Sequence, residues 1–245
     1  MKAVFRVVYG VWCWTLLSVC GTGALLLALP LPTLTQRRRV ARGSARLFLA
    51  ASGMRLTITG LAHLPPGPCV LVANHASYLD GVIMQAALPP RFAFLIKREM
   101  RTMPIAGIML ARLGSEFMER HDRKRSGADA RRVLKQAQRG HSLAVFPEGT
   151  FTATIGIDHF HAGAFMTAAR AGLPVVPAVI RGARQLLPAE QFLPRPGRVH
   201  VAILPPLPAI TATDRPSIHR LRDDARRAIL ANADEPDLHA PTDAG

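Results

Sequence analysis

Short apolar runs alternate with helical segments along most of the chain, and this alternation restricts the possible folds more than any other feature. Residues 69–73 (CVLVA) and 142–145 (SLAV) are continuous apolar runs, as in strands covered on both faces. Strands that alternate with helices form mostly parallel sheets. We therefore expect an α/β fold with a mostly parallel central sheet flanked by helices. The expected strands are 54–60, 69–73, 91–97, 115–120, 142–147, 174–180 and 198–204; the expected helices are 78–88, 104–114, 126–140 (with Ser126 as N-cap and Gly140 as its stop), 161–172 and 214–233.

The first 36 residues differ from the rest of the chain. No charged side chain occurs from Val7 to Gln36, and this apolar stretch is long enough to cross a bilayer. It is too long for the core of a cleaved signal peptide, so we expect a hydrophobic membrane helix that stays attached. Gly21 and Gly23, with Pro30 and Pro32, also allow a re-entrant helical hairpin, and the sequence leaves both arrangements open.

An arginine cluster follows this apolar stretch. By the positive-inside rule it places the remainder of the chain on the cytoplasmic face, here of a bacterial inner membrane. The segment 37–53 either lies in the anionic membrane interface as a basic amphipathic helix or is an ordinary solvated basic surface. The cluster consists of Arg37, Arg38, Arg39, Arg42 and Arg46.

The composition indicates which class of binding partner suits the chain. The 31 basic residues outnumber the 16 acidic ones, so an anionic partner is expected. With 49% hydrophobic residues, anionic membrane lipids fit better than nucleic acid, because the 6% of aromatic residues offer no stacking platform for bases. The three cysteines lack metal-ligand spacing, so we expect no metal. The expected organisation is a membrane-anchoring segment at 1–36, one domain at 37–232 and a disordered, polar tail at 233–245.

Polar side chains cluster directly after the apolar run at 69–73. Ser77 and Asp80 have the spacing of a variant capping box, which is a purely structural interpretation. That interpretation leaves Asn74 and His75 unexplained at the carboxyl end of a buried strand, where open α/β sheets place their ligands. If Asp80 folds back on His75, the carboxylate fixes the imidazole and leaves the other ring nitrogen free to act as a general base.

Two further clusters have simple alternatives of their own. FPEGT at 146–150 follows the apolar run at 142–145, so Glu148 belongs to the same edge of a parallel sheet as His75, or else to an exposed tight turn. The stretch 114–120 leads into a basic patch, where Arg120 can bind a phosphate or remain an ordinary solvated charge.

Four blocks in this order resemble those of the glycerolipid acyltransferases, the 1-acylglycerol-3-phosphate acyltransferases and their relatives. They are NHASYLD (74–80), GSEFMER (114–120), FPEGT (146–150) and VVP (175–177), and the resemblance covers residues 45–232. It implies that His75 deprotonates the free hydroxyl of a lysophospholipid and that Asp80 holds the histidine. The hydroxyl oxygen then attacks the thioester of acyl-CoA or acyl carrier protein, which is a co-substrate; no cofactor is implied.

The resemblance also implies the binding residues. Arg120 would bind the acceptor phosphate, Glu148 and Gly149 would shape the acceptor site, and residues 175–177 would contribute to the acyl side. The substrate-binding set is Asn74, Ser77, Gly114, Phe117, Arg120, Glu148, Gly149, Thr150, His161 and Arg181.

Two departures from the family pattern weaken phosphate binding. The third block often continues as EGTRS, whereas Phe151 and Thr152 follow Thr150 here. His161 stands where the family often has Lys or Arg. The acceptor is expected to be 1-acylglycerol-3-phosphate, giving phosphatidic acid; the alternative is a lyso-ornithine lipid or another lysophospholipid. Arg181 and Arg184 could compensate for the lost cations.

Other functions fit less of the sequence. A lipid esterase or thioesterase would use His75 to activate water and would need no lyso-lipid acceptor. A non-catalytic membrane or nucleic-acid binder would rest on charge alone. Neither accounts for four ordered blocks.

Overall fold

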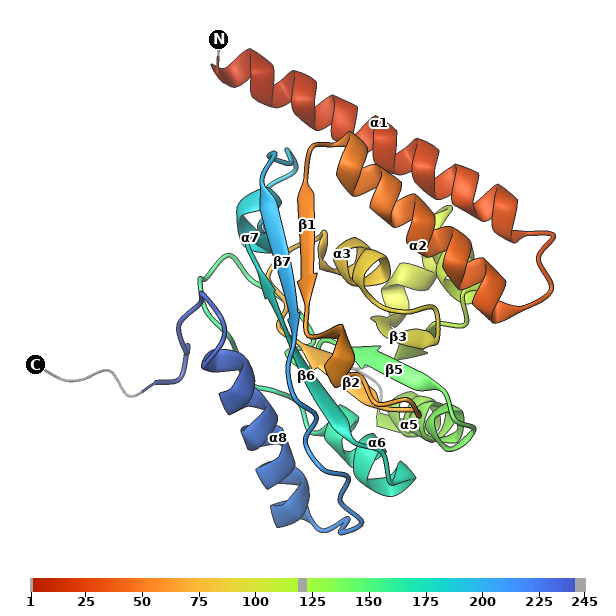
Figure 1. The fold of residues 1–245 in the computed structure, drawn as a ribbon, viewed down its shortest axis with the longest axis vertical. Helices are drawn as coiled ribbons and strands as arrows, with labels where there is room; N and C mark the ends of the chain where they lie inside the picture. The colour runs from red at the N-terminus through yellow and green to blue at the C-terminus, as the bar shows by residue number, and fades with distance from the viewer. Residues whose placement is uncertain (1, 119–122, 241–245) are drawn as a thin grey trace, which may run out of the picture.

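The computed structural model describes residues 2–118 and 123–240. Within them, seven strands form one sheet in the order β1-β7-β6-β2-β5-β3-β4 (Figure 1). The strands are β1 (Arg55–Thr59), β2 (Val70–Ala73), β3 (Phe92–Lys97), β4 (Glu116–Met118), β5 (Ser142–Val145), β6 (Val175–Arg181) and β7 (Arg198–Ile203). The helices are α1 (Lys2–Ala28), α2 (Leu34–Ala51), η1 (Leu61–His63), α3 (Asp80–Ala87), η2 (Arg98–Thr102), α4 (Ala106–Arg112), α5 (Arg123–Gln138), α6 (Gly163–Ala171), α7 (Ala183–Leu186) and α8 (Arg215–Leu230).

The sheet is mostly parallel, which confirms the predicted α/β fold. The strand pairs β6–β2, β2–β5, β5–β3 and β3–β4 are all parallel. Only β6 and β7 pair in antiparallel fashion among the described strands, while β7 and β1 run parallel to each other. The carboxyl ends of β2, β5 and β3 therefore lie together along one edge of the sheet.

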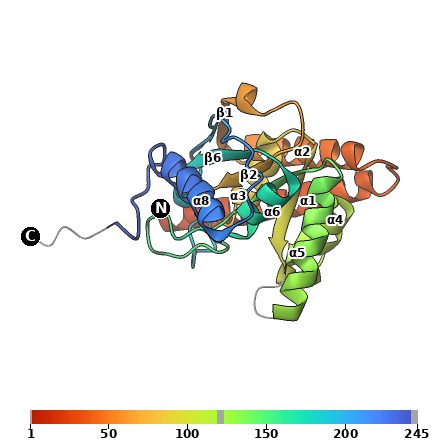
Figure 2. The ribbon, with the colours of Figure 1, turned by 90° about the horizontal axis from the view of Figure 1, so that it is seen from below.

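Helices cover both faces of the sheet, and the side chains of β2 show why its sequence is apolar throughout. Leu71 and Ala73 belong to the core under α2 and α3, with Phe48 and Ile83 among its members. Val70 and Val72 point into the other core, which α5, α6 and α8 cover. Burial of each large side chain contributes roughly 1.5–3 kcal/mol. In both views α5 lies on the opposite side of the molecule from the C-terminal segment (Figures 1 and 2).

The N-terminus forms a helical hairpin in which α1 runs antiparallel along α2 (Figure 1). Residues 3–28 are long and apolar enough to cross a membrane by length and composition, and only 17% of their most apolar window is buried. The helix continues through Gly21 and Gly23, and the two prolines fall in the turn before α2. The expected N-terminal hydrophobic helix is thus present, as one continuous helix and not as a hairpin within the apolar stretch.

Arginines of α2 point toward the domain. The buried Arg38 guanidinium donates to the carbonyls of Leu113 (2.8 Å) and Arg91 (3.1 Å). Arg42 and Arg46 donate to carbonyls in the last turn of α3, at Ala86 and Ala87. The last carbonyls of a helix have no partners within it and carry partial negative charge, so they attract cations. Arg38 therefore belongs to neither of the two surfaces considered for this segment, lipid-facing or solvated, whereas Arg42 is half-buried and Arg46 stays exposed while its guanidinium binds α3.

Two predicted boundaries differ from the structure. Helix α5 begins at Arg123, before the expected N-cap Ser126, and ends near Gly140, whose φ of 85° is the left-handed conformation typical of a helix stop. Residues 233–240, expected to start a disordered tail, pack against the segment 156–159 and form a bridge between Asp237 and Ile157. Their acidic side chains form ion pairs with arginines of β6, α7 and α8, which a prediction from local composition does not include.

Candidate active site

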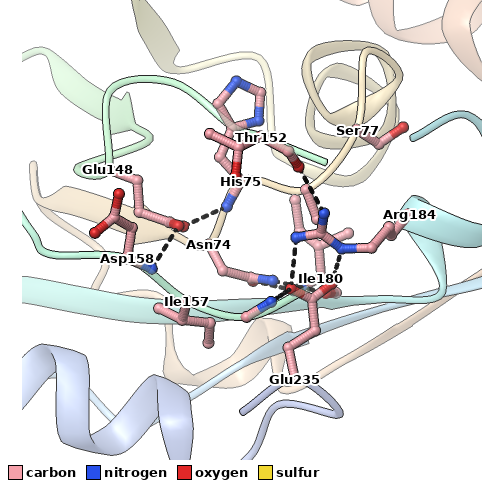
Figure 3. Close-up of polar contacts among 12 residues, drawn as sticks. Asn74, His75, Ser77, Glu148, Thr152, Ile157, Asp158, Ile180, Arg184 and Glu235 are labelled. Carbon is pink, nitrogen blue, oxygen red and sulfur yellow. Dashed lines mark hydrogen bonds and ion pairs between the residues drawn. The ribbon is translucent and has the colours of Figure 1, made fainter. Parts of the chain in front are cut away.

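The polar clusters after β2 and β5 meet at one edge of the sheet (Figure 3). Because β2 and β5 are parallel neighbours, the turn after Ala73 and the turn after Val145 leave the sheet side by side. His75 comes from the first turn and Glu148 from the second. The sequence prediction that these residues share one edge agrees with this geometry.

His75 and Asp80 form a hydrogen-bonded pair. The Nδ1 atom of His75 lies 2.8 Å from Oδ2 of Asp80, which is completely buried at the first position of α3. The same oxygen accepts the backbone N–H groups of Ala76 (2.7 Å) and Ser77 (2.9 Å). A carboxylate held this way keeps the proton of the neutral imidazole on Nδ1, so Nε2 is left to accept a proton. Asp80 Oδ1 has no hydrogen-bond partner in the described part of the chain.

Asn74 and Ser77 are buried and bound to the backbone of other segments. The amide of Asn74 accepts from the N–H of Ile180 (2.7 Å) and donates to its carbonyl (3.0 Å). The hydroxyl of Ser77 donates to the carbonyl of Leu187 at 2.8 Å and accepts from the N–H of Leu79 at 3.1 Å. Both side chains thus anchor the histidine turn to β6 and the segment after it.

Glu148 connects the histidine turn to a third segment. One carboxylate oxygen accepts the backbone N–H of His75 at 2.7 Å, and the other accepts that of Asp158 at 3.0 Å (Figure 3). Burial raises the pKa of Glu148 to about 7, although both amide hydrogen bonds act to lower it. Two donors aimed at the two oxygens favour the ionised form, so burial and hydrogen bonding oppose each other at this residue.

Aromatic rings surround the imidazole. The ring of Phe146 stacks on His75, with centroids 4.4 Å apart and planes inclined by 17°. The ring of Phe151 lies 4.5 Å from His75 on a tilted plane and meets Tyr78 edge-on at 4.8 Å. The His75 side chain keeps 17% of its surface exposed, so the imidazole is partly desolvated but accessible. From the sequence, Phe151 was interpreted only as the loss of an arginine from the family pattern, and the contact between Phe151 and His75 was not predicted.

The second predicted block is only partly described. Gly114 precedes β4 with a φ of 69° and lies close to α2, at the amino end of its strand and so away from the edge that carries His75. Phe117 is buried in β4, where the guanidinium of Arg101 lies 5.9 Å from its ring centroid. Arg120 lies outside the described residues.

The remaining cations differ in their partners. Lys97, at the end of β3, donates to the hydroxyl of Thr150 at 2.9 Å. This lysine was not predicted from the sequence as a site residue, although its place at the end of an expected strand was a signal that could have identified it. Arg181 donates to the carbonyl of Asn232 and pairs with Asp234.

Three other predicted positions are placed as follows. Arg184 pairs with Glu235, so this arginine, like Arg181, is engaged by an acidic residue of the C-terminal segment. Gly149 adopts a φ of 80° in the turn and donates to the carbonyl of Phe146. His161 is exposed, and its backbone N–H bonds to Pro147.

The described side chains contain no group of three or more His, Cys, Asp and Glu residues placed to hold a metal ion. Residues 175–177 lie within β6 and are buried in the sheet. The structure is thus an α/β fold with a hydrogen-bonded histidine–aspartate pair at the carboxyl edge of its sheet.

Residues 55–181 match the family described as Acyltransferase, and the chain belongs to this family, as its sequence blocks predicted. It is 31% identical over 214 residues to the lyso-ornithine lipid O-acyltransferase of Pseudomonas aeruginosa, covering 79% of each protein. It is 34% identical to the 1-acyl-sn-glycerol-3-phosphate acyltransferase alpha of Mus musculus, over 73% of this chain and 63% of that one. The matched region spans only 51% of the Brassica napus relative of the same activity.

The fold itself has a solved counterpart. The crystal structure of the 1-acyl-sn-glycerophosphate acyltransferase of Thermotoga maritima superposes with a TM-score of 0.77. The two chains share 20% identity, and the superposition covers 95% of this chain and 98% of that one. At this identity the likeness supports the fold alone.

Proposed function

We propose that the protein transfers a fatty acyl group from acyl-CoA or acyl carrier protein to the free hydroxyl of a lyso-lipid, with 1-acylglycerol-3-phosphate as the acceptor. The observation that carries this proposal is the His75–Asp80 pair at the carboxyl end of β2, with one imidazole nitrogen left to accept a proton.

The reaction needs a base and accurate positioning. Nε2 of His75 takes the hydroxyl proton while the oxygen attacks the thioester carbonyl carbon. The C–S bond breaks, the acyl group stays on the new ester, and the imidazolium returns its proton to the departing thiolate. Asp80 stabilises the imidazolium that forms between these steps. Glu148 holds the backbone of His75, so the base keeps its position relative to the acceptor.

A phosphate-bearing acceptor is supported by charge. The chain carries a net charge of +15, and Lys97 lies beside Thr150 in the turn that contains Glu148. A cationic side chain at this edge of the sheet suits the phosphate of a lysophospholipid. The apolar helix α1 and the basic composition support action at the cytoplasmic face of the inner membrane, where anionic lipids gather.

A lyso-ornithine lipid is the second candidate acceptor, favoured by a specific observation. Phe151 packs on His75 at the position where the family pattern often has arginine, and acidic residues engage Arg181 and Arg184. An acceptor without a phosphate would need fewer cations there. The Pseudomonas aeruginosa relative is named for this acceptor.

Thiol release from acyl-CoA and acyl carrier protein tests both candidates. The full chain in detergent is assayed with each lyso-lipid, alongside His75→Ala and the control His219→Ala on the exposed surface of α8. We expect acceptor-dependent release that falls about 10²- to 10⁴-fold in His75→Ala and persists in the control.

The acceptor that supports release decides between the two lipids. Release without any acceptor, accompanied by free fatty acid, would instead indicate a hydrolase. Full activity of His75→Ala would rule out the assigned base.

A further inference from the structure

The chain returns to the active site after α8. Residues 233–240, here called the C-terminal strap, lie along residues 149–161, here called the acceptor loop. The N–H of Ile157 donates to the carbonyl of Pro236 (2.9 Å), and the N–H of Leu238 donates to the carbonyl of Ile157 (3.3 Å). At Gly156, with φ 142°, a Cβ atom would stand 2.7 Å from the Leu238 side chain. The strap and the loop therefore fit closely.

A bidentate ion pair fixes this contact at its centre. The Nε and Nη2 atoms of Arg184 each lie 2.8 Å from a carboxylate oxygen of Glu235 (Figure 3). The two side chains are only 12% and 15% exposed, a setting in which such a pair is screened less than on the surface. The Nη1 atom of Arg184 also donates to the carbonyl of Thr152 at 2.8 Å, and Glu235 accepts the N–H of Gly156 at 3.3 Å. The pair thus holds both halves of the acceptor loop.

A continuous set of contacts leads from this pair to the catalytic histidine. Two residues beyond Gly156, the N–H of Asp158 donates to Glu148, which accepts the N–H of His75 through its other oxygen. Arg226 of α8 reinforces the same segment, because its guanidinium donates to the carbonyls of Ile157 and Asp158 and pairs with Asp237 of the strap.

We propose that Glu235 is a positioning residue for acyl transfer: through Arg184 it holds the acceptor loop, and with it Glu148, in the conformation that places His75. This inference rests on the proposed function, and Glu235 touches no reacting atom. The acceptor loop has no helix or strand of its own, so without the pair its conformational freedom increases. Small displacements of a positioned base cost large factors in rate.

The test compares Glu235→Ala, Glu235→Gln and the charge reversal Arg184→Glu/Glu235→Arg in the full chain. Asp223→Ala is the matched control, since it removes an exposed pair with Arg222 on α8. We expect Glu235→Ala to lower kcat/KM for the acceptor about 10- to 100-fold while the donor KM stays unchanged. The reversal should recover part of this loss, and the control should equal the wild type.

Amide hydrogen exchange provides a second, activity-independent measurement. Glu235→Ala should speed exchange at residues 150–158 and leave α3 and α6 as protected as in the wild type. Wild-type acceptor kinetics together with unchanged exchange would overturn the proposal, as would a loss of protection throughout the domain. If the wild type transfers acyl groups to no acceptor, the proposed function fails, while the exchange data still report whether Glu235 holds the loop.

Discussion

Among single residues of the candidate site, Glu148 has a carboxyl group whose pKa changes on folding. Its pKa rises from the ordinary 4.5 to about 7 because the side chain is buried. The folded protein therefore binds this proton more tightly than the unfolded chain, so the contribution of Glu148 to stability is fully present below pH 4.5 and is lost as the pH rises through 7. Glu148→Gln removes the titrating group. Between pH 5 and pH 8 we expect the wild type to lose about 2–3 kcal/mol more unfolding free energy than the variant.

Urea unfolding of both proteins at the two pH values measures this difference. The glutamine also leaves one of the two backbone N–H groups without an acceptor, which lowers stability at every pH and cancels in the comparison. Equal losses in the two proteins would show that Glu148 ionises in the folded state as it does in the unfolded chain.

The residues of the site differ in whether nearby positions in the sequence are enough to predict them. His75 and Asp80 are five positions apart, and Glu148 follows an apolar run, so a reader of the sequence can group them. Arg184 and Glu235 are 51 positions apart, and only the folded chain shows that they meet. For the same reason the sequence suggested Arg184 as a spare phosphate ligand, whereas the strap already supplies its carboxylate.

Helices and strands also differ in how much of their structure the sequence predicts, and the arginines of α2 are an example that can be tested. The strands were evident from apolar runs, but the destination of the α2 arginines was not, because the carbonyls they bind belong to α3. We expect Arg42→Ala/Arg46→Ala to lower the unfolding free energy by about 1–3 kcal/mol, since it leaves the carbonyls at the end of α3 without these donors.

The exposed Arg39 on the same helix is the matched control for this double variant. It has no polar partner among the described residues, and Arg39→Ala should change stability by less than about 0.5 kcal/mol. Chemical denaturation in detergent measures all three proteins. Equal effects of the double variant and the control would mean that the contacts between α2 and α3 contribute no net stability.

At the scale of the whole molecule, the apolar helix α1 and the positive net charge both favour binding to an anionic membrane. Helix α1 packs against α2 through small buried residues such as Cys13, Ala24 and Ala28. Its other side exposes a long apolar face, and the chain carries a net charge of +15. Apolar insertion and attraction to anionic headgroups are the two contributions that hold a protein on a bilayer. The exposed apolar residues of α1 include Val4, Phe5, Val7, Val8, Val11, Trp12, Val19, Leu26 and Leu27.

Vesicle binding separates these two contributions. The full chain should sediment with vesicles of phosphatidylglycerol and phosphatidylcholine, and added salt should weaken binding by screening only the headgroup attraction. Val8→Asp/Val11→Asp places two charges on the apolar face, and we expect at least about a tenfold loss of binding at any salt concentration. Leu61→Asp, a substitution of an exposed leucine in η1, is the control and should bind as the wild type does. If the double variant binds as well as the wild type, the membrane contact lies elsewhere than on α1, and its apolar face then needs another explanation, such as contact with a second protein.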